Sequence, residues 1–181
     1  MELNKPKNIS DWIKIYRLYK SAFPRYERKP FLLICRMFRK GSADVWVIED
    51  NGGFSGLAVT MNSDNLILLD YFAVHGSRRG LGIGSKALKL LQDKYGNSRL
   101  FLEIESTFTD CANKPERIRR KAFYLKNGMS ELKIAVNLFG TEMELLGYNC
   151  SLDYDEYYSL YTSNLGEWIK DKISQLNYPG Q

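Results

Sequence analysis

The chain has 181 residues, enough for one domain with an adequate hydrophobic core, and its 44% hydrophobic and 26% charged content is ordinary for a globular protein. Its formal net charge of +5 suits an anionic ligand but is too small to indicate nucleic-acid binding. No apolar run reaches the ~18 residues of a membrane span, and the first ten residues lack the apolar core of a signal peptide. We therefore expect a cytoplasmic protein with neither a nucleic-acid nor a membrane partner.

The cysteine and histidine content argues against a metal centre. Cys35, Cys111 and Cys150 are odd in number and widely spaced, which is typical of free thiols in a reducing compartment rather than of a disulfide framework or zinc site. The single histidine, His75, leaves little from which to build a zinc site or a histidine-dependent nucleophile. We expect no bound metal.

The first forty residues predict two helices. The first spans residues 8–23, where Asn8 or Ser10 can cap the N-terminus and a buried stripe has helical spacing: Trp12, Ile15, Tyr16 and Tyr19. A charged connector, residues 25–29, leads to a second helix over residues 31–39, which Pro30 can begin and Gly41 can end.

Three strands are predicted next. Apolar residues 45–49 and 54–60 flank Asp-Asn-Gly-Gly at residues 50–53, a strong hairpin signal, and a turn at residues 62–65 follows. Residues 66–74 then form a near-continuous apolar run, as a strand buried on both faces would. We expect an antiparallel meander, which counts against a Rossmann domain because that fold opens with βαβ repeats.

The rest of the chain alternates helices and strands. We predict a helix over residues 85–95, a strand over 100–105, a helix over 115–127 with Ile118, Ala122 and Leu125 inward, and a hairpin of residues 131–138 and 141–146 around Phe139-Gly140. Because a helix connects them, the strands at 66–74 and 100–105 should be parallel. The tail at residues 153–176 predicts helix and is rich in acidic residues and tyrosine.

A basic, glycine-rich loop follows the strand at 66–74. It has the sequence RRGLGIG at residues 78–84, and such a turn presents free backbone N–H groups at the positive end of a helix dipole. This arrangement predicts a phosphate site, which the two arginines strengthen through paired hydrogen bonds. A P-loop is excluded because Lys86 follows Ser85, whereas a dinucleotide fingerprint is loosely met by Gly82, Gly84 and Ala87.

Two segments resemble the GNAT acetyltransferase superfamily. Arg79, Gly82 and Gly84 form the pattern R-x-x-G-x-G after the strand end Ala73-Val74, which is similar to the acyl-CoA-binding motif of that family. Residues 122–129, AFYLKNGM, are similar to the family segment that carries a tyrosine beside the thioester sulfur.

The resemblance implies an α+β protein with the GNAT fold. In this fold a mixed central sheet, made of an antiparallel meander and a splayed parallel strand pair, is flanked by helices. The order of the predicted elements is similar to the family along residues 8–146, and residues 153–176 would add a C-terminal helical extension. We expect residues 1–181 to form a single domain.

The resemblance also implies acetyl transfer from acetyl-CoA to a primary amine by direct attack in a ternary complex, without an acyl-enzyme. The pyrophosphate of this cosubstrate would lie on the loop amides of Arg79, Gly80, Leu81, Gly82, Ile83, Gly84 and Ser85. The pantetheine arm would pair with Phe72, Ala73 and Val74, where the parallel strands splay. The Val74 amide would polarise the acetyl carbonyl.

Tyr124 is the expected acid for the departing thiolate, and three carboxylates are candidates for the base. Asp70 lies four residues before Val74, the spacing at which histone-acetylating members of the family carry a base glutamate. Glu105 ranks level with Asp70, and Glu103 comes third, with substrate binding as its expected role. Structural interpretations remain open beside these: a core tyrosine for Tyr124, a paired carboxylate for Asp70 and a solvated or ion-paired residue for Glu103.

Three functional classes remain open from the sequence. The first is an N-acetyltransferase, the second is a non-catalytic acyl-CoA-binding or sensor module of the same fold, and the third is a dinucleotide-dependent enzyme. The acceptor, a small-molecule or peptide amine, is not identified, although acidic residues suggest a cationic one: Glu103, Glu105, Asp110 and Asp153. A homodimer is common in the family and is compatible with the tyrosine-rich tail.

Overall fold

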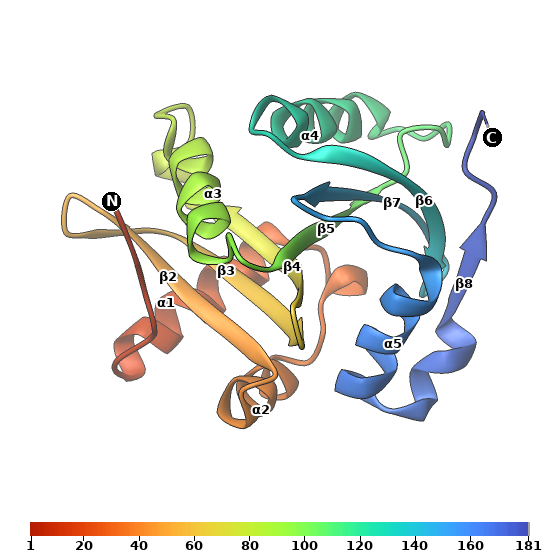
Figure 1. Cartoon of the computed structure of the whole chain (residues 1–181). Helices are drawn as coiled ribbons and strands as arrows, with labels where there is room; N and C mark the ends of the chain where they lie inside the picture. Colours follow the sequence, from red (N-terminus) through yellow and green to blue (C-terminus); the bar gives the residue numbers. More distant parts are fainter. Residues whose placement is uncertain (181) are drawn as a thin grey trace. The chain divides into compact units, whose positions relative to one another are not determined.

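The computed structural model describes residues 1–180 and has eight strands in one sheet there, in the order β1-β2-β3-β4-β5-β7-β6-β8 (Figure 1). The chain divides into two compact units. The first unit comprises Met1–Asn62 and Leu69–Tyr95, and the second comprises Ser63–Leu68 and the residues from Gly96 onward. A mixed sheet with flanking helices confirms the predicted fold class.

Helices α1 and α2 of the first unit pack on one face of its strands. Helix α1, Ile9–Ala22, begins where the Asn8 side chain accepts a hydrogen bond from the Asp11 amide at 3.0 Å. A short 3-10 turn, η1 (Arg25–Glu27), leads to α2, Phe31–Lys40. The inward side chains join one apolar core with the strands: Ile15, Leu18, Tyr19, Ile34, Val45, Val47, Leu57, Val59, Tyr71 and Ala73.

Tyr16 is the exception in the predicted buried stripe of α1. Its side chain is 42% exposed, while Ile15, Leu18 and Tyr19 are buried. Residues three and four apart share a helix face, so Leu18 and Tyr19 both follow Ile15 on the inward side. Tyr16 lies at the rim of that face, where its ring centroid is 5.0 Å from the ring centroid of Phe31.

Strands β2, Ala43–Asp50, and β3, Gly53–Ser63, form the predicted antiparallel hairpin. Its turn residues Asn51 and Gly52 both have positive φ, which a type I′ turn requires and which explains why the Asn-Gly pair signals a hairpin. Strand β1, Glu2–Asn4, pairs antiparallel with β2 but was not predicted, because three residues are too few to show an alternating pattern.

Helix α3, Ile83–Lys94, packs on the next strand, β4 (Leu66–Val74), through the apolar cluster on the other face of the first unit. In this cluster Phe72 and Val74 of β4 pack against Ile83 and Ala87 of α3 and Ile48 of β2. Because alternate residues of a strand point to opposite faces, Tyr71 and Ala73 of β4 belong instead to the core that β4 forms with α1 and α2. The predicted start of the helix is two residues late, and the helix itself is confirmed.

The second unit contains β5 (Arg99–Glu105), α4 (Lys114–Lys126) and a hairpin of β6 (Ser130–Leu138) and β7 (Thr141–Tyr148). Strand β5 pairs in parallel with the first three residues of β4 and antiparallel with β7, so the predicted parallel pair is confirmed. The β6–β7 turn has positive φ at both of its residues, as the Phe-Gly pair there suggested.

Helix α4 presents a different face inward from the one that its apolar spacing predicts. Three residues that were expected inward are exposed: Ile118, Ala122 and Leu125. Tyr124 is buried instead, and the side chains of Arg117 and Lys121 are each 13% exposed. Both cations pair with buried carboxylates, so charge pairing, rather than apolar spacing, decides how this helix is oriented.

The tail begins in the predicted helix, α5 (Tyr154–Leu165), whose capping box joins Asp153 and Glu156. A 3-10 segment, η3 (Glu167–Lys172), follows, and the chain then forms a strand, β8 (Ile173–Leu176). The prediction of helix is wrong for these last four residues. They pair antiparallel with β6, whose edge offers main-chain donors and acceptors that a tail helix would leave unpaired.

Buried tyrosines should make the fold sensitive to alkaline pH. Burial raises the pKa of Tyr95 and Tyr157 above its ordinary value and raises the pKa of Tyr124 to about 12. A pKa that is higher in the folded state stabilises the fold below the unfolded-state pKa, and this contribution is lost as the pH rises through the folded-state pKa. A difference of about one between the folded-state and unfolded-state pKa of a group corresponds to about 1.4 kcal/mol of stability.

The melting temperature should therefore fall as the pH rises from about 10 toward 12, and thermal unfolding scans over this range measure it. The variant Tyr124→Phe should lose less stability than the parent protein over the same interval. An equal loss in both proteins would contradict the raised pKa of Tyr124.

Candidate active site

The loop before α3 offers six backbone N–H groups, those of residues 80–85, that have no hydrogen-bond acceptor within residues 1–180. A 3-10 turn, η2 (Gly76–Arg78), leads into this loop. Gly80 and Gly82 have φ of +79° and +73°, a region that other residues rarely adopt. The amides lie at the N-terminal end of the α3 dipole, where negative charge is stabilised, so the loop can bind a diphosphate.

Two arginines flank these amides. The Arg79 Nε group donates to the Val74 carbonyl at 3.3 Å, so its side chain folds back along the end of β4. Arg78 lies against the β2–β3 turn, since a Cβ added to Gly53 would be 3.1 Å from its Nη2 atom. Residues 79–85, which were predicted to hold the pyrophosphate, lie together in the first unit. The prediction is wrong for one amide, because the Arg79 N–H already donates to the Gly76 carbonyl at 3.3 Å, as the short 3-10 turn requires.

The end of β4 has one main-chain edge that faces away from β3. On the other edge, the His75 amide donates to a carbonyl of β3 at 2.8 Å, and the Ala73 carbonyl also faces β3. Successive residues of a strand direct their N–H and C=O groups to opposite edges, so Phe72 and Val74 direct theirs away from β3. The register of β4 with β5 ends at Leu68. An extended, amide-containing chain can add to this edge at Phe72 and Val74.

Gly56 of β3 is a residue of this region that the sequence analysis missed. A Cβ at this position would lie 2.5 Å from the Ala73 carbonyl oxygen, so a side chain here would push β3 and β4 apart. A glycine inside an apolar strand pattern indicates such a close backbone approach, and this was the available signal.

Asp70 is bound by Lys29, a residue that the sequence analysis did not connect with it. Lys29 Nζ lies 2.7 Å from Asp70 Oδ1, and the two side chains are 12% and 7% exposed. The Tyr71 hydroxyl donates to the Glu27 carbonyl and accepts from the Lys29 amide, at 2.8 and 2.9 Å. The Tyr19 hydroxyl donates to the Lys29 carbonyl at 2.9 Å. The connector is thus fixed to β4 and α1 on both sides of Lys29.

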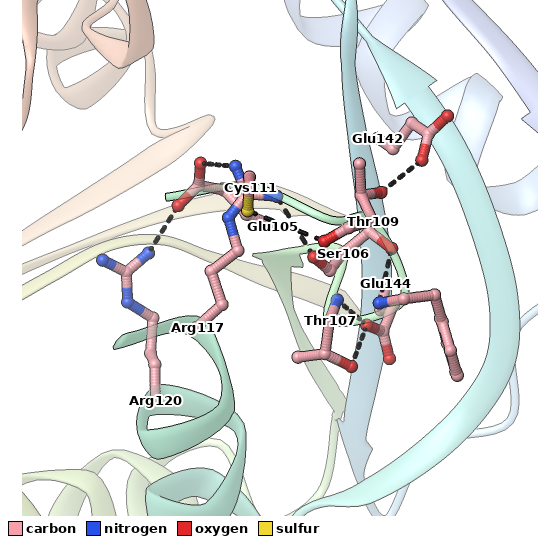
Figure 2. Close-up of polar contacts among 10 residues, drawn as sticks. Glu105, Ser106, Thr107, Thr109, Cys111, Arg117, Arg120, Glu142 and Glu144 are labelled. Carbon is pink, nitrogen blue, oxygen red and sulfur yellow. Dashed lines mark hydrogen bonds and ion pairs between the residues drawn. The ribbon is translucent and has the colours of Figure 1, made fainter. Parts of the chain in front are cut away.

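Glu105 of β5 lies between two arginines of α4 (Figure 2). Arg117 Nη2 is 2.7 Å from one carboxylate oxygen, and Arg120 Nη1 is 3.5 Å from the other. Arg117 also donates to the Ser106 carbonyl at 3.1 Å. The Glu105 side chain is only 6% exposed, so this pairing occurs largely out of water. The two leading candidates for the base, Asp70 and Glu105, are therefore already paired with cations.

Tyr124 of α4 is buried, and its hydroxyl has no hydrogen-bond partner in the part of the chain that the structure describes. Burial raises its pKa to about 12, although the positive charge of Arg120 acts in the opposite direction. The hydroxyl therefore keeps its proton at neutral pH, as a general acid must before it reacts. A neighbouring cation could have favoured the tyrosinate, but burial is the larger effect here.

Glu103 of β5 is held by the tail. The Tyr161 hydroxyl donates to both carboxylate oxygens of Glu103, at 2.8 and 2.9 Å. Burial and the negative charge of Glu103 together raise the pKa of Tyr157, which lies one helical turn earlier on α5. No sequence pattern signals this contact, because 58 residues separate Glu103 from Tyr161.

Glu144 of β7 organises the loop that follows β5 (Figure 2). Its side chain is 2% exposed, and Lys121 Nζ lies 2.6 Å from one carboxylate oxygen. The Thr107 hydroxyl donates to the other oxygen at 2.7 Å, and the Thr109 hydroxyl donates to Glu142 at 2.6 Å. The loop at residues 106–113 is thus held against the β6–β7 hairpin by charged side chains that the sequence analysis did not single out.

The predicted site residues are divided between the two units. The first unit contains Asp70, Phe72, Ala73, Val74 and residues 79–85, and the second contains Glu103, Glu105 and Tyr124. Within residues 1–180 no group of three or more histidine, cysteine or acidic side chains is arranged to hold a metal ion. No helix in that range is both long and apolar enough to cross a membrane.

Solved structures with a similar fold are acetyltransferases. A GNAT-family protein from Bacteroides thetaiotaomicron has a TM-score of 0.76 and 20% identity, over 92% of this chain and 99% of its own. A mutant spermidine N-acetyltransferase from Vibrio cholerae has a TM-score of 0.63 and 14% identity, over 82% and 94%. A Bacillus subtilis acetyltransferase in complex with CoA has a TM-score of 0.59 and 14% identity, over 81% and 95%. Identities this low show a shared fold.

The family itself follows from the sequence. The model of the acetyltransferase (GNAT) family matches residues 12–129, and the chain belongs to this family. The matched range includes both segments on which the resemblance depended, the loop at residues 78–84 and the segment at residues 122–129. Comparison with curated proteins gives no match.

Removing the Glu144 carboxylate should destabilise the protein strongly. The variant Glu144→Ala leaves the Thr107 amide without this acceptor and leaves Lys121 only the more exposed Glu131, 3.2 Å away. Breaking a fully buried pair costs about 3–5 kcal/mol, and the loss here should approach that range. Denaturant unfolding measures the loss. Asp110→Ala is the matched control, because it removes a carboxylate that is 96% exposed and paired only with Lys114, and it should change stability little. Equal effects would contradict the structural role of Glu144.

Proposed function

We propose that the protein is an acetyl-CoA-dependent N-acetyltransferase that acts on a primary amine by direct attack in a ternary complex. The new C–N bond forms as the C–S bond breaks, the amine nitrogen loses a proton, and the sulfur of CoA gains one. Family membership supports acetyl transfer. The observation that best supports the cosubstrate is the run of unpaired amides at residues 80–85 beside two arginines.

The first unit supplies the groups that bind acetyl-CoA. The amides of residues 80–85 bind the diphosphate, and Arg78 and Arg79 balance its charge. The edge of β4 at Phe72 and Val74 pairs with the amides of the pantetheine arm as an added strand would. Ala73 directs its main-chain groups toward β3, so it contributes to this edge only by holding β4 in place.

Two groups of the chain act on the reacting atoms in this proposal. The Val74 amide donates a hydrogen bond to the acetyl carbonyl, where negative charge develops during attack. Tyr124 gives its proton to the sulfur that leaves, a role that suits a hydroxyl that keeps its proton at neutral pH and has no hydrogen-bond partner within residues 1–180.

The ion pairs of Asp70 and Glu105 favour positioning roles for both residues over the role of general base. The amine then releases its proton to water, which favours acceptors of low pKa. At pH 7, deprotonation costs about 4–5 kcal/mol for a lysine-like amine of pKa ~10.4 but only about 1 kcal/mol for a peptide α-amine of pKa ~8. Turnover should therefore rise with pH until the acceptor amine is neutral.

The same ion pairs favour one alternative function, an acyl-CoA-binding module without turnover, because each of the two leading candidate bases is paired with a cation. A thiol-release assay with acetyl-CoA over polyamines, aminoglycosides, amino acids and peptides separates the two functions. Thiol release that depends on an amine supports the enzyme. Saturable CoA binding with no release across the panel supports the binding module.

The loop glycines should be needed for acetyl-CoA binding. Gly82→Ala places a side chain at φ +73°, which costs about 1–2 kcal/mol and moves the loop away from the conformation that presents its amides. Gly41→Ala is the matched control, with φ +78° and equally open surroundings at the end of α2. Both variants should melt earlier, but calorimetric titration should show about tenfold weaker acetyl-CoA binding only for Gly82→Ala. Equal affinities of the two variants for acetyl-CoA would contradict the proposal that the amides of residues 80–85 bind its diphosphate.

Tyr124→Phe should slow turnover while leaving CoA affinity nearly unchanged. A positioned general acid contributes about 10²-fold or more, and phenylalanine keeps the buried ring while it removes the proton. Steady-state kinetics and CoA titration of the same preparation measure both quantities. Weakened CoA binding with unchanged kcat would show that Tyr124 is structural.

A further inference from the structure

The acidic residues that suggested a cationic acceptor all have protein partners. The pairs are Glu103 with Tyr161, Glu105 with Arg117, Asp110 with Lys114, and Asp153 with the Glu156 amide. A paired carboxylate must give up its partner before it binds a substrate cation, which reduces any gain in binding. These residues therefore do not favour a cationic acceptor.

The helix pair of the first unit carries the opposite charge. Residues 9–40 contain nine basic and two acidic side chains. The difference, nine minus two, gives this segment a formal net charge of +7, which exceeds the net charge of the whole chain, +5. Both acidic residues are partly buried, whereas seven basic residues are exposed: Lys14, Arg17, Lys20, Arg25, Arg36, Arg39 and Lys40. A surface of one sign attracts ligands of the opposite sign and speeds their arrival.

The connector at residues 25–29 brings this positive charge to β4. Asp70 and Tyr71 are consecutive, so their side chains leave β4 on opposite faces, and Lys29 bonds to both. The end of the connector is therefore held against β4, the same strand whose Val74 amide faces away from β3. Four residues separate Asp70 from Val74, a distance of about 13 Å along a strand.

Arg28 of the connector has donors without a partner. Its Nε atom is buried and has no hydrogen bond within residues 1–180, and its Nη1 atom reaches only the Lys20 carbonyl, at 3.5 Å. An anionic ligand can reach the exposed end of this guanidinium, where the hydrogen bond to the Lys20 carbonyl is long. Asp70, a carboxylate of the adjoining strand, is paired with Lys29.

We propose that the acceptor is a primary amine that also carries an anionic group, and that Arg25 and Arg28 bind this group. The proposal rests on the acetyl transfer proposed above and adds the substrate class. Lys29 is a positioning residue, because its ammonium ties the connector to β4 and cancels the charge of Asp70, which would otherwise attract cationic amines. A short acidic peptide supplies both the amine and the anionic group.

The test compares peptides with one acceptor amine each and different side-chain charge. Thiol release from acetyl-CoA is measured with C-terminally amidated Ala-Glu-Glu-Ala, Ala-Gln-Gln-Ala and Ala-Arg-Arg-Ala, and spermidine is included as a polyamine. A hydrogen bond to a charged group is worth about 1.5–3 kcal/mol, so the acidic peptide should have a kcat/KM at least about tenfold above the neutral one. Added salt should reduce this preference. Equal rates, or a preference for the basic peptide or spermidine, would overturn the proposal.

Three variants assign the preference to the connector. Arg28→Gln should remove most of the preference for the acidic peptide. Lys29→Gln removes the cation that pairs with Asp70 and should therefore move the preference toward the basic peptide. A merely structural loss would not reverse the preference in this way. Lys29→Arg should restore the original preference for the acidic peptide. Arg119→Gln removes an exposed cation of α4 and is the control for net charge. This variant should keep the preference for the acidic peptide.

A binding measurement keeps the two proposals distinguishable. Anisotropy of a fluorescently labelled acidic peptide, in the presence of CoA, reports recognition without turnover. One outcome is that the acidic peptide binds, that Arg28→Gln weakens this binding, and that no acceptor gives thiol release. This outcome would contradict the proposed catalysis but support the binding of an anionic ligand at Arg28. Absence of peptide binding, with acetyl-CoA still raising the melting temperature, would overturn the anionic acceptor alone.

Discussion

Six consecutive backbone N–H groups that have no acceptor within residues 1–180 are the constraint on which the rest of this structure depends. Such groups are stable only in contact with water or with an anion, so the loop at residues 80–85 has to remain open. Positive φ at Gly80 and Gly82 gives the loop its path, and Ile83 anchors the start of α3 in the core below it. The fold keeps unsatisfied donors aimed outward, which is what binding of a diphosphate requires.

A second organising feature is the use of ion pairs at buried positions. Lys29 with Asp70, Arg117 with Glu105, and Lys121 with Glu144 each join two different elements, and the carboxylates are 7%, 6% and 2% exposed. Taking charges out of water offsets much of their attraction, so such pairs add little net stability. Their geometry nevertheless orients the connector, helix α4 and the loop after β5, because no other arrangement would leave all the charges paired.

These pairs change how the candidate chemistry is interpreted. From the sequence alone, a carboxylate near the end of a strand is interpreted as a general base or as a binding site for a cation. Asp70 and Glu105, however, are paired with Lys29 and Arg117 of the chain itself. Catalysis in the proposed reaction then depends on Tyr124 and on main-chain donors, and the charge left to attract an acceptor is positive. Arg28, whose Nε atom has no hydrogen-bond partner within residues 1–180, is part of this positive charge, and for this reason we infer an acceptor that carries an anionic group.

Local chemistry determined much of this protein from the sequence. The Asn-Gly turn, the glycine-rich loop, the strand at residues 66–74 and the parallel relation of β4 and β5 depend on neighbours in the chain, and each was predicted. The partners of Asp70, Glu103 and Glu105 were not, and neither were the orientation of α4 and the strand β8. These features depend on contacts between residues that are far apart in sequence. Whether a buried charge or a strand edge finds a partner is decided by the element that packs against it. Only the tertiary structure brings those elements together.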